Sequence, residues 1–351
     1  MIPTLEFDAR LAPHLLQLTA ALKRVEAVFD EQLASDLPPI MQLVSHVEKY
    51  RGKMLRPMLV LLCGQCVSGD DGLVPGARHL AAGAVCEMVH MATLVHDDVL
   101  DEADTRRRGD TVNRLHGNET AVILGDYLIA SAYHLCSSKV GHEGSLAVAR
   151  ASTVMCSGEL LQLHHRADFS LDEATYFEII RRKTGELIAT ACELGAVLAG
   201  ASDPGIYYNF GMELGVAFQI QDDLLDLTGS ERVVGKSVGK DLEKGKLTLP
   251  IIHMLYSASR SQRGELLLLL EQACVDSGLG DRAAAAAMST IAACLESSGS
   301  IRYARGVASS YVDRAKSRLG CLPGAQGAER GTSAAKEILL TMADAVVARA
   351  F

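Results

Sequence analysis

Residues 86–101 read Cys-Glu-Met-Val-His-Met-Ala-Thr-Leu-Val-His-Asp-Asp-Val-Leu-Asp, an apolar stretch that ends in a cluster of aspartates. A second apolar stretch ends in the same layout, Asp222-Asp-Leu-Leu-Asp226. In each cluster the aspartates stand at positions i, i+1 and i+4, and positions i and i+4 share a face of a helix. Like charges this close repel unless a cation lies between them. We therefore expect two helices that face each other across a cavity and share divalent cations.

The ligand chemistry of the two clusters favours magnesium. Mg²⁺ prefers carboxylate oxygens and usually completes its shell with water and substrate phosphate. One such cluster is more often a solvated helix face, but two of them inside apolar segments are not explained in that way. The sequence therefore predicts a diphosphate substrate held through magnesium.

The composition predicts an all-α protein. Of the 351 residues, 48% are hydrophobic, only 5% are aromatic and tryptophan is absent. This balance suits helix-on-helix packing better than β-sandwiches, and alternating β-branched runs with hairpin turns are nearly missing. No low-complexity linker interrupts the chain, so we expect residues 1–351 to form a single all-α domain, with 1–40 as a peripheral helical region.

Charge and cysteine usage narrow the class of protein. The net charge of −9 argues against nucleic acid as a partner. No run has the roughly 18–20 apolar residues of a membrane span, and the first residues do not resemble a signal peptide. The nine cysteines lie in apolar stretches, which is typical of buried free thiols in a reducing compartment. Cys63-Gly-Gln-Cys66 has redox or zinc spacing, but without a second pair a core role is favoured. We expect a soluble, cytoplasmic protein.

Apolar periodicity and turn residues predict the helices. The predicted ranges are 13–35, 41–50, 57–67, 76–100, 119–138, 144–163, 170–182 with a continuation to 199, 207–227, a helix from 250, two more beyond 278, and the last over 333–350. Ser170-Leu-Asp-Glu173 is interpreted as a capping box that opens the seventh of these helices. A Gly/Lys-rich loop is expected over 229–249.

Further motifs follow one another in a fixed order along the chain. They are Gly52-Lys-Met-Leu-Arg-Pro57, His90 ahead of His96-Asp-Asp98, the run from Asp97 to Arg107, Gly158-Glu-Leu-Leu-Gln162, Lys183-Thr184, Phe218-Gln-Ile-Gln-Asp-Asp-Leu-Leu-Asp226 and Gly245-Lys-Leu-Thr-Leu-Pro250. In this order and spacing, from about residue 52 to the C-terminal helix, the chain resembles the trans-isoprenyl diphosphate synthases (polyprenyl synthetases), and most of all the long-chain octaprenyl and polyprenyl synthases among them.

The resemblance implies a helical bundle of the isoprenoid-synthase type around a central cavity, and a homodimer. It also implies a transferase reaction, in which isopentenyl diphosphate joins an allylic diphosphate head to tail and pyrophosphate leaves. Breaking the allylic C–O bond creates a carbocation and an anionic leaving group, which metal ions stabilise as Lewis acids. No side-chain general base is evident, and in the family the released pyrophosphate removes the proton.

The same resemblance assigns roles to individual residues. Three magnesium ions would be held by Asp97, Asp101 and Asp222, with Asp98, Asp223 and Asp226 acting mainly through water. The catalytic set is completed by Lys183, Thr184 and Gln219, of which the last two would turn oxygen dipoles toward the developing cation. The allylic diphosphate would be contacted by Arg106, Lys183 and Lys246, with Lys236 or Lys240 as a further contact. Isopentenyl diphosphate would be contacted by Lys53, Arg56, His90 and Arg107.

The chain departs from the family pattern at two positions. Arg108 stands where the family commonly has glycine, so it stays open which of Arg106, Arg107 and Arg108 contacts which diphosphate. Lys240 stands where an acidic or small residue is frequent, and it is either a contact or an exposed charge.

Product length is predicted from the residues before the first cluster. Ala92 and Thr93 would form the first floor below the aspartates, and Met88 and Val89 the next. Each helical turn rises about 5.4 Å, comparable to one isoprene unit, so small residues here indicate a long product of about 30–50 carbons. A product of about 20 carbons is the alternative, since Met88, Tyr127 or Tyr133 would close the tunnel earlier. The small residues are also explained if they only allow close helix packing.

Two rival functions remain. A terpene cyclase shares the fold and an acidic first motif, but it has no need for Lys53, Arg56 and His90 at a second diphosphate. A non-catalytic subunit of a heteromeric synthase predicts degraded clusters, whereas both clusters are intact. A short-chain synthase making geranylgeranyl or farnesyl diphosphate is the nearer alternative. For product release we expect transient membrane contact.

Overall fold

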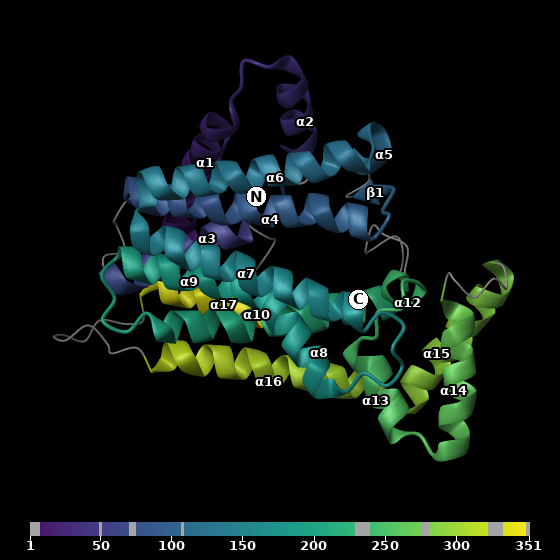
Figure 1. Cartoon of the computed structure of the whole chain (residues 1–351). Coiled ribbons are helices and arrows are strands. Elements are labelled where there is room, and N and C mark those ends of the chain that lie inside the picture. Colours follow the sequence, from purple (N-terminus) through teal and green to yellow (C-terminus); the bar gives the residue numbers. More distant parts are fainter. Residues whose placement is uncertain are drawn as a thin grey trace. The chain divides into compact units, whose positions relative to one another are not determined.

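The computed structural model describes residues 8–48, 51–69, 75–106, 109–228, 239–274, 281–321 and 333–348, without the side chains of 281–284. In this part of the chain nearly every element is a helix, and the predicted all-α class is confirmed (Figure 1). The helices divide into two compact units. Unit 1 comprises Met1–Thr153, Glu186–Met212 and Ala315–Ala345, and unit 2 comprises Val154–Gly185, Glu213–Arg314 and Val346–Phe351.

Unit 1 is built around one long apolar helix. It contains η1 (Ala9–Leu11), α1 (Ala12–Leu33), α2 (Pro38–Glu48), α3 (Leu55–Ser68), α4 (Ala77–Leu100), α5 (Val112–His116), α6 (Asn118–Leu135), the π-helical η2 (Cys136–Val140) and α9 (Glu186–Leu198). Helix α4 packs against α1, α3, α6 and α9, and Figure 1 shows α4 and α6 side by side. Its residues 80–89 are all buried, as expected for a helix that is apolar on most sides.

Close contact between α3 and α9 depends on a glycine. A Cβ atom at Gly195 would stand 2.1 Å from the carbonyl oxygen of Val60, so any side chain there would force the two helices apart. The residues that α3 buries include Met58, Leu59 and Leu62, which have no exposed surface. The run that contains Cys63 therefore serves the core, as the sequence suggested.

A small hairpin follows the first aspartate cluster. Strand β1 (Thr105–Arg106) pairs antiparallel with β2 (Gly109–Asp110). Thr111 closes the hairpin, because its hydroxyl donates to the carbonyl of Ala103 at 2.6 Å and accepts the N–H of Arg114 at the start of α5. The sequence did not predict these strands, which are too short to show alternation.

Unit 2 contains α8 (Glu173–Ile180), the π-helical η3 (Arg181–Gly185), α12 (Lys240–Glu243), α13 (Leu249–Ser257), α14 (Arg260–Ala273) and α15 (Asp281–Ser297). Figure 1 shows α14 and α15 side by side, and they are in contact. The unit boundaries fall within or at the ends of four further helices: α7 (His142–His164), α10 (Gly205–Thr228), α16 (Ser300–Gly320) and α17 (Ala334–Val347).

Several sequence predictions need correction. The capping box at Ser170 is wrong, because α8 is capped by Asp172, whose carboxylate accepts the N–H of Thr175 at 2.7 Å. Ser170 instead donates to Asp168. Helix α2 begins three residues earlier than predicted, at Pro38, where proline fits the first turn.

Other predictions about the helices and thiols also change. Helix α14 was not predicted, and of the expected loop the residues 240–243 are helical while 229–238 lie outside the described part. None of the nine cysteines forms a disulfide, and Cys156 and Cys321 are exposed rather than buried. None of the helices in the described ranges combines the length and the apolar character needed to cross a membrane.

Candidate active site

The first aspartate cluster lies at the C-terminal end of α4 in unit 1, and its middle carboxylate is buried and paired with an arginine. Asp98 is only 2% exposed. Nε of Arg106, carried by β1, donates to both oxygens of Asp98 at 2.8 and 3.0 Å, and Nη2 of the same arginine lies 2.7 Å from Oδ1. This is a fork-like guanidinium–carboxylate pair, the strongest geometry for such an interaction. The sequence placed Arg106 on a diphosphate and did not foresee this partner.

One face of α4 stays accessible along its C-terminal half. His90, Thr93, Leu94, Asp97 and Asp101 are half-buried and follow one another at helical spacing, so they form one stripe. Within the stripe, the hydroxyl of Thr93 donates to the carbonyl of His90 at 2.7 Å. The outer aspartates of the cluster therefore share a face, as predicted.

The other predicted chain-length residues lie off this stripe. Ala92 and Met88 have no exposed surface, and Val89 is 2% exposed. Of the four residues predicted to set product length, Thr93 alone shares the accessible face of α4 with Asp97. The burial of Ala92 agrees with the alternative that the sequence left open, in which small residues allow close helix packing.

The second cluster lies on α10 in unit 2, and its middle carboxylate is also buried. Asp223 is 4% exposed. The hydroxyl of Tyr176 on α8 donates to its Oδ2 at 2.6 Å, and Nε2 of Gln219, one turn earlier on α10, donates to its Oδ1 at 2.8 Å. Oε1 of Gln219 in turn accepts the hydroxyl of Thr184 at 2.6 Å. The structure thus joins Thr184 and Gln219, which the sequence assigned to catalysis, to one another.

Burial changes the acidity of this carboxylate. Desolvation raises the pKa of Asp223 to about 8, and the nearby charges of Asp241 and Asp222 add to the rise, while the hydrogen bonds from Tyr176 and Gln219 lower it. Burial and the charge of Asp223 also raise the pKa of the Tyr176 phenol. Tyr176 escaped the sequence analysis because a single tyrosine in an apolar helix carries no signal of its own.

The outer aspartates of the second cluster are more accessible. Asp222 and Asp226 are half-buried. Oδ2 of Asp226 accepts the N–H of Asp241 at 3.1 Å, and its carbonyl accepts the N–H of Gly239 at 2.7 Å. These bonds attach the short helix α12 to the end of α10, so Asp226 both belongs to the cluster and anchors the segment that follows the Gly/Lys-rich stretch.

Lys183 and Thr184 sit on a π-helical turn, a local widening that is frequent at functional sites. Nζ of Lys183 donates to Oε1 of Gln162 at 3.0 Å and forms an ion pair with Glu159. Gly158 permits this contact, because a Cβ there would stand 2.9 Å from the backbone nitrogen of Lys183. The Gly-Glu-Leu-Leu-Gln motif therefore holds the side chain of Lys183 in position.

Lys246, a second cation of unit 2 that the sequence assigned to the allylic diphosphate, follows a constrained turn. Gly245 has φ +69°, and its carbonyl accepts the N–H of Ala167 at 2.8 Å. A Cβ at Gly245 would stand 3.0 Å from that same nitrogen. Lys246 is half-buried, and its own N–H donates to the carbonyl of Asp241 at 2.8 Å. The backbone from 239 to 246 is thus tied to α10 and to the segment before α8.

Unit 1 carries three of the residues predicted for isopentenyl diphosphate. Lys53 is exposed, and His90 lies on the accessible stripe of α4. In Arg56, Nε is buried without a hydrogen-bond partner among the described residues, and burial lowers the pKa of the guanidinium, while the charge of Glu87 raises it. Glu87 is 2% exposed, and the sequence analysis missed it, although it stands one turn before His90. Arg107, Arg108 and Lys236 lie outside the described residues.

The described residues test whether a metal could be held by protein groups alone. Among them, no group of three or more His, Cys, Asp or Glu side chains is arranged to bind a metal ion. The outer aspartates of each cluster offer two half-buried carboxylates within their own unit. Two carboxylates with the remaining positions left to water and phosphate are the donor set that suits Mg²⁺.

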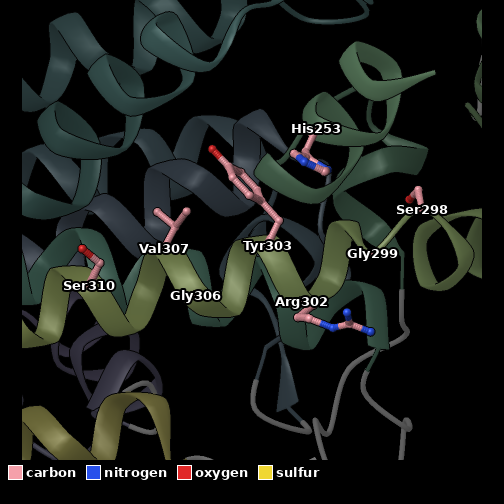
Figure 2. A pocket seen from close by; sticks show the side chains of 8 residues that line it. All are labelled: His253, Ser298, Gly299, Arg302, Tyr303, Gly306, Val307 and Ser310. Atoms are coloured by element: carbon pink, nitrogen blue, oxygen red, sulfur yellow. The ribbon is translucent and has the colours of Figure 1, made fainter. Parts of the chain in front are cut away.

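A surface pocket of unit 2 provides a contrast. It has a volume of about 570 Å³ and is lined from α13 and α16. The rings of His253 and Tyr303 stack there at 4.1 Å, and Figure 2 shows Arg302 projecting from the opposite side of α16. Because its one arginine does not converge with the ring pair, this pocket lacks the clustered cations that a diphosphate needs.

Comparison with known proteins now identifies the family. The family model described as polyprenyl synthetase matches residues 38–285. The chain is 33% identical to the octaprenyl diphosphate synthase of Escherichia coli (strain K12) over 88% of this chain and 92% of that one. It is 32% identical to a short chain isoprenyl diphosphate synthase of Methanothermobacter thermautotrophicus over 95% of this chain and 99% of that one.

A solved structure agrees with these sequence relatives. The polyprenyl synthase of Caulobacter crescentus CB15, complexed with calcium and isoprenyl diphosphate, superimposes with a TM-score of 0.84 at 30% identity, covering 97% of this chain and 98% of that one. The motifs, the helical architecture and these likenesses agree, and the chain belongs to the polyprenyl synthetase family, whose members are prenyl-transferring enzymes.

Proposed function

We propose that this chain is a Mg²⁺-dependent prenyltransferase that condenses isopentenyl diphosphate with an allylic diphosphate to give a long all-trans polyprenyl diphosphate of about 30–50 carbons. The observation that carries the proposal is the shared design of the two aspartate clusters. In each cluster the middle carboxylate is buried and hydrogen-bonded, and the outer two are half-buried on one helix face. Membership of the polyprenyl synthetase family supports the same activity.

The reaction breaks the bond between C1 of the allylic chain and its diphosphate oxygen, and the bonding electrons leave with pyrophosphate. The double bond of isopentenyl diphosphate then attacks C1 through its C4, and loss of a proton from C2 forms the new double bond. Departing pyrophosphate takes that proton. Lys183, Lys246 and Arg106 would neutralise the leaving group, with Lys236 or Lys240 as a further contact.

Magnesium, when bound, would stabilise the leaving pyrophosphate as a Lewis acid, and the resemblance to the family implies about three ions. Asp97, Asp101 and Asp222 would hold these ions around one diphosphate. Asp98, Asp223 and Asp226 would act through the other aspartates, since each is engaged with protein groups.

Isopentenyl diphosphate would be bound by Lys53, Arg56, His90 and Arg107. Two observations support this assignment: Nε of Arg56 has no hydrogen-bond partner among the described residues, and His90 lies on the same stripe as Asp97. A site for a second diphosphate distinguishes a chain-elongating enzyme from a terpene cyclase. If Arg56 contacts isopentenyl diphosphate, an Arg56→Met variant should lose affinity for that substrate and keep its affinity for the allylic substrate. Equal losses for both substrates would contradict the assignment.

Product length differs among the similar proteins, which include an octaprenyl synthase and a short-chain synthase. We propose that the growing prenyl product lies along the accessible stripe of α4, where Thr93 stands one turn before Asp97. Thr93→Phe should therefore shorten the product to about 15–20 carbons with Mg²⁺ dependence intact. Ala92→Phe is the paired variant, since Ala92 is buried off the stripe.

The two variants separate the chain-length residues. If Ala92→Phe shortens the product and Thr93→Phe does not, the growing chain follows the buried side of α4 that the sequence first indicated. If neither variant changes the product length, neither Ala92 nor Thr93 sets it. Product length is read by mass analysis of the dephosphorylated alcohols.

A homodimer formed through α6 is part of the proposal. Ile123 is 66% and Val122 41% exposed on that helix, and apolar side chains of this size seldom face water side by side without a partner. Ile123→Glu should convert a dimer into a monomer in sedimentation experiments, and a wild-type monomer would refute the dimer. Cytoplasmic location and transient membrane contact during product release complete the proposal.

The central test uses labelled isopentenyl diphosphate, farnesyl diphosphate and Mg²⁺. We expect label in polyprenyl products longer than 20 carbons. Products of about 20 carbons or fewer would favour the short-chain alternative. Turnover of the allylic diphosphate without isopentenyl diphosphate would indicate a cyclase. No product under any condition, from a folded protein, would indicate a non-catalytic subunit.

A further inference from the structure

A continuous series of side-chain hydrogen bonds runs through unit 2 from α8 to the π-helical turn. The hydroxyl of Tyr176 donates to Asp223 at 2.6 Å, Nε2 of Gln219 donates to the other oxygen of Asp223 at 2.8 Å, and the hydroxyl of Thr184 donates to Oε1 of Gln219 at 2.6 Å. Each member has a distinct partner. The series therefore has a direction, with every donor pointing toward Asp223.

This direction decides which atoms Thr184 and Gln219 present. Because Asp223 accepts from Gln219, the amide nitrogen must face Asp223 and the amide oxygen must face Thr184. A threonine hydroxyl has one proton and two lone pairs. Thr184 spends its proton on Gln219, so in all other directions its oxygen offers lone pairs. Lone pairs stabilise a nearby cation, whereas an outward O–H proton would oppose it.

Tyr176 holds the far end of the series. It is 3% exposed and its ring meets that of Phe177 edge-on at 5.5 Å, so the hydroxyl has a fixed position. Asp223 is equally buried, which means that water cannot readily replace a lost donor. If the phenol were removed, Asp223 would be free to turn toward its remaining donor, Gln219, and the amide and Thr184 would lose their fixed orientation.

We propose that Tyr176 is a positioning residue for the reaction, which acts through Asp223 and Gln219 to keep the lone pairs of Thr184 directed at the allylic cation. This inference rests on the proposed function, because it assumes that a cation forms beside Thr184. It assigns to Tyr176 a role in the chemical step and none in binding either diphosphate.

The chain offers a matched control for Tyr176. Tyr303, also in unit 2, donates its hydroxyl to Glu173 at 2.8 and 3.0 Å. It makes the same phenol–carboxylate contact, and its partner Glu173 has no hydrogen bond to a proposed catalytic group among the described residues. Tyr176→Phe and Tyr303→Phe each remove one hydroxyl and leave the ring. A difference between them in turnover reports the connection to Thr184, and a shared loss reports stability only.

The first experiment compares steady-state constants of the two variants. Tyr176→Phe should lower kcat about tenfold and leave the KM of both substrates within about threefold of wild type. Tyr303→Phe should leave kcat unchanged, and thermal denaturation checks that both variants are folded. Equal kcat values for both variants would overturn the inference, and so would a rise in KM with kcat unchanged.

The second experiment measures whether Tyr176 acts through Thr184. Thr184→Val removes the hydroxyl with little change of volume, and in that background Tyr176→Phe should have almost no further effect on kcat. Additive losses would show that Tyr176 acts by another route. A binding readout complements turnover: calorimetry with Mg²⁺ and an allylic diphosphate analogue that carries an ammonium nitrogen in place of the cationic carbon.

Tyr176→Phe should weaken binding of this ammonium analogue about tenfold and leave binding of a thio-diphosphate analogue, whose chain carries no positive charge, unchanged. If both analogues weaken equally, Tyr176 serves diphosphate binding and the inference is wrong. Failure of the proposed function looks different: the wild-type protein would then form no product from the two diphosphates, and neither analogue would bind in a Mg²⁺-dependent way.

Discussion

In the first aspartate cluster the buried Asp98 faces the guanidinium of Arg106, whereas in the second the buried Asp223 accepts hydrogen bonds from the neutral donors Tyr176 and Gln219. Arginine carries a permanent charge, so Asp98 has its counter-ion within the protein. Asp223 has no counter-ion among the described residues, and burial with the neighbouring Asp241 raises its pKa to about 8. The two clusters have the same spacing in sequence but different means of holding their middle carboxylate.

The difference also shows what each cluster is connected to. Arg106 belongs to the hairpin after α4, so the Asp98 pair fastens a loop to the end of its helix. The partners of Asp223 lead to Thr184 on the π-helical turn. A salt bridge secures structure around the first cluster, and a directed hydrogen-bond series ties the second cluster to groups proposed to act in catalysis.

The largest expected effect falls on the outer aspartates, where the two clusters should behave alike. Asp97→Ala and Asp222→Ala should each lower kcat/KM by about 10³-fold or more, equivalent to roughly 4 kcal/mol of transition-state stabilisation. Steady-state kinetics measures this, with circular dichroism as a check of folding. Asp104→Ala, an exposed carboxylate close to the first cluster, is the control and should keep wild-type activity. A cluster variant within threefold of wild type would contradict the shared role.

The middle aspartates should differ in stability. Arg106→Met leaves Asp98 buried without its cation, and we expect the free energy of unfolding to fall by about 3 kcal/mol. Tyr176→Phe removes one neutral donor from Asp223 and should cost about 1–2 kcal/mol. Chemical denaturation measures both. Combining Asp98→Leu with Arg106→Met should restore most of the loss, because a buried pair replaced by apolar residues leaves no uncompensated charge. Equal losses for Arg106→Met and Tyr176→Phe would remove the distinction between the clusters.

The smallest expected effect concerns the contact between Gly158 and the π-helical turn that carries Lys183. Gly158→Ala places a Cβ 2.6 Å from that of Arg182 and 2.9 Å from the nitrogen of Lys183, so the π-helical turn must shift. Overpacking of this kind costs about 1–3 kcal/mol of stability, and the displaced Lys183 should raise the KM of the allylic substrate. Gly264→Ala is the control, because α14 has open space there and alanine favours a helix by about 0.5–1 kcal/mol. A gain of stability in both variants would contradict this prediction, because it would show that the packing of α7 against the π-helical turn does not depend on Gly158.

Much of the fold could be predicted because its helices are long and apolar. Helices α4 and α10 were expected within two residues of their observed ends, since each carries an uninterrupted apolar pattern that stops at a glycine, a turn or the aspartates themselves. The π-helical turn at Arg181–Gly185 could not be predicted. It arises where α7 approaches across Gly158, and that contact joins positions more than 20 residues apart.

The candidate site was predictable to the level of residue types and not of partners. The six aspartates have a spacing that shows in sequence, and it predicts which of them share a helix face. The pairing of Asp98 with Arg106 depends on a hairpin whose strands have only two residues each. The bond from Tyr176 to Asp223 spans 47 positions between two helices. Contacts of this kind follow from tertiary packing, which leaves no local pattern in a single sequence.

The proposal that both clusters grip one diphosphate is tested most directly by calorimetry of Mg²⁺-dependent pyrophosphate binding. The proteins to compare are wild type, Asp97→Ala, Asp222→Ala and the double variant. Shared binding predicts that either single change removes most of the affinity and that the double variant is little weaker than the singles. Losses that simply add, or a single variant that binds pyrophosphate and Mg²⁺ as wild type does, would show that the two clusters act separately.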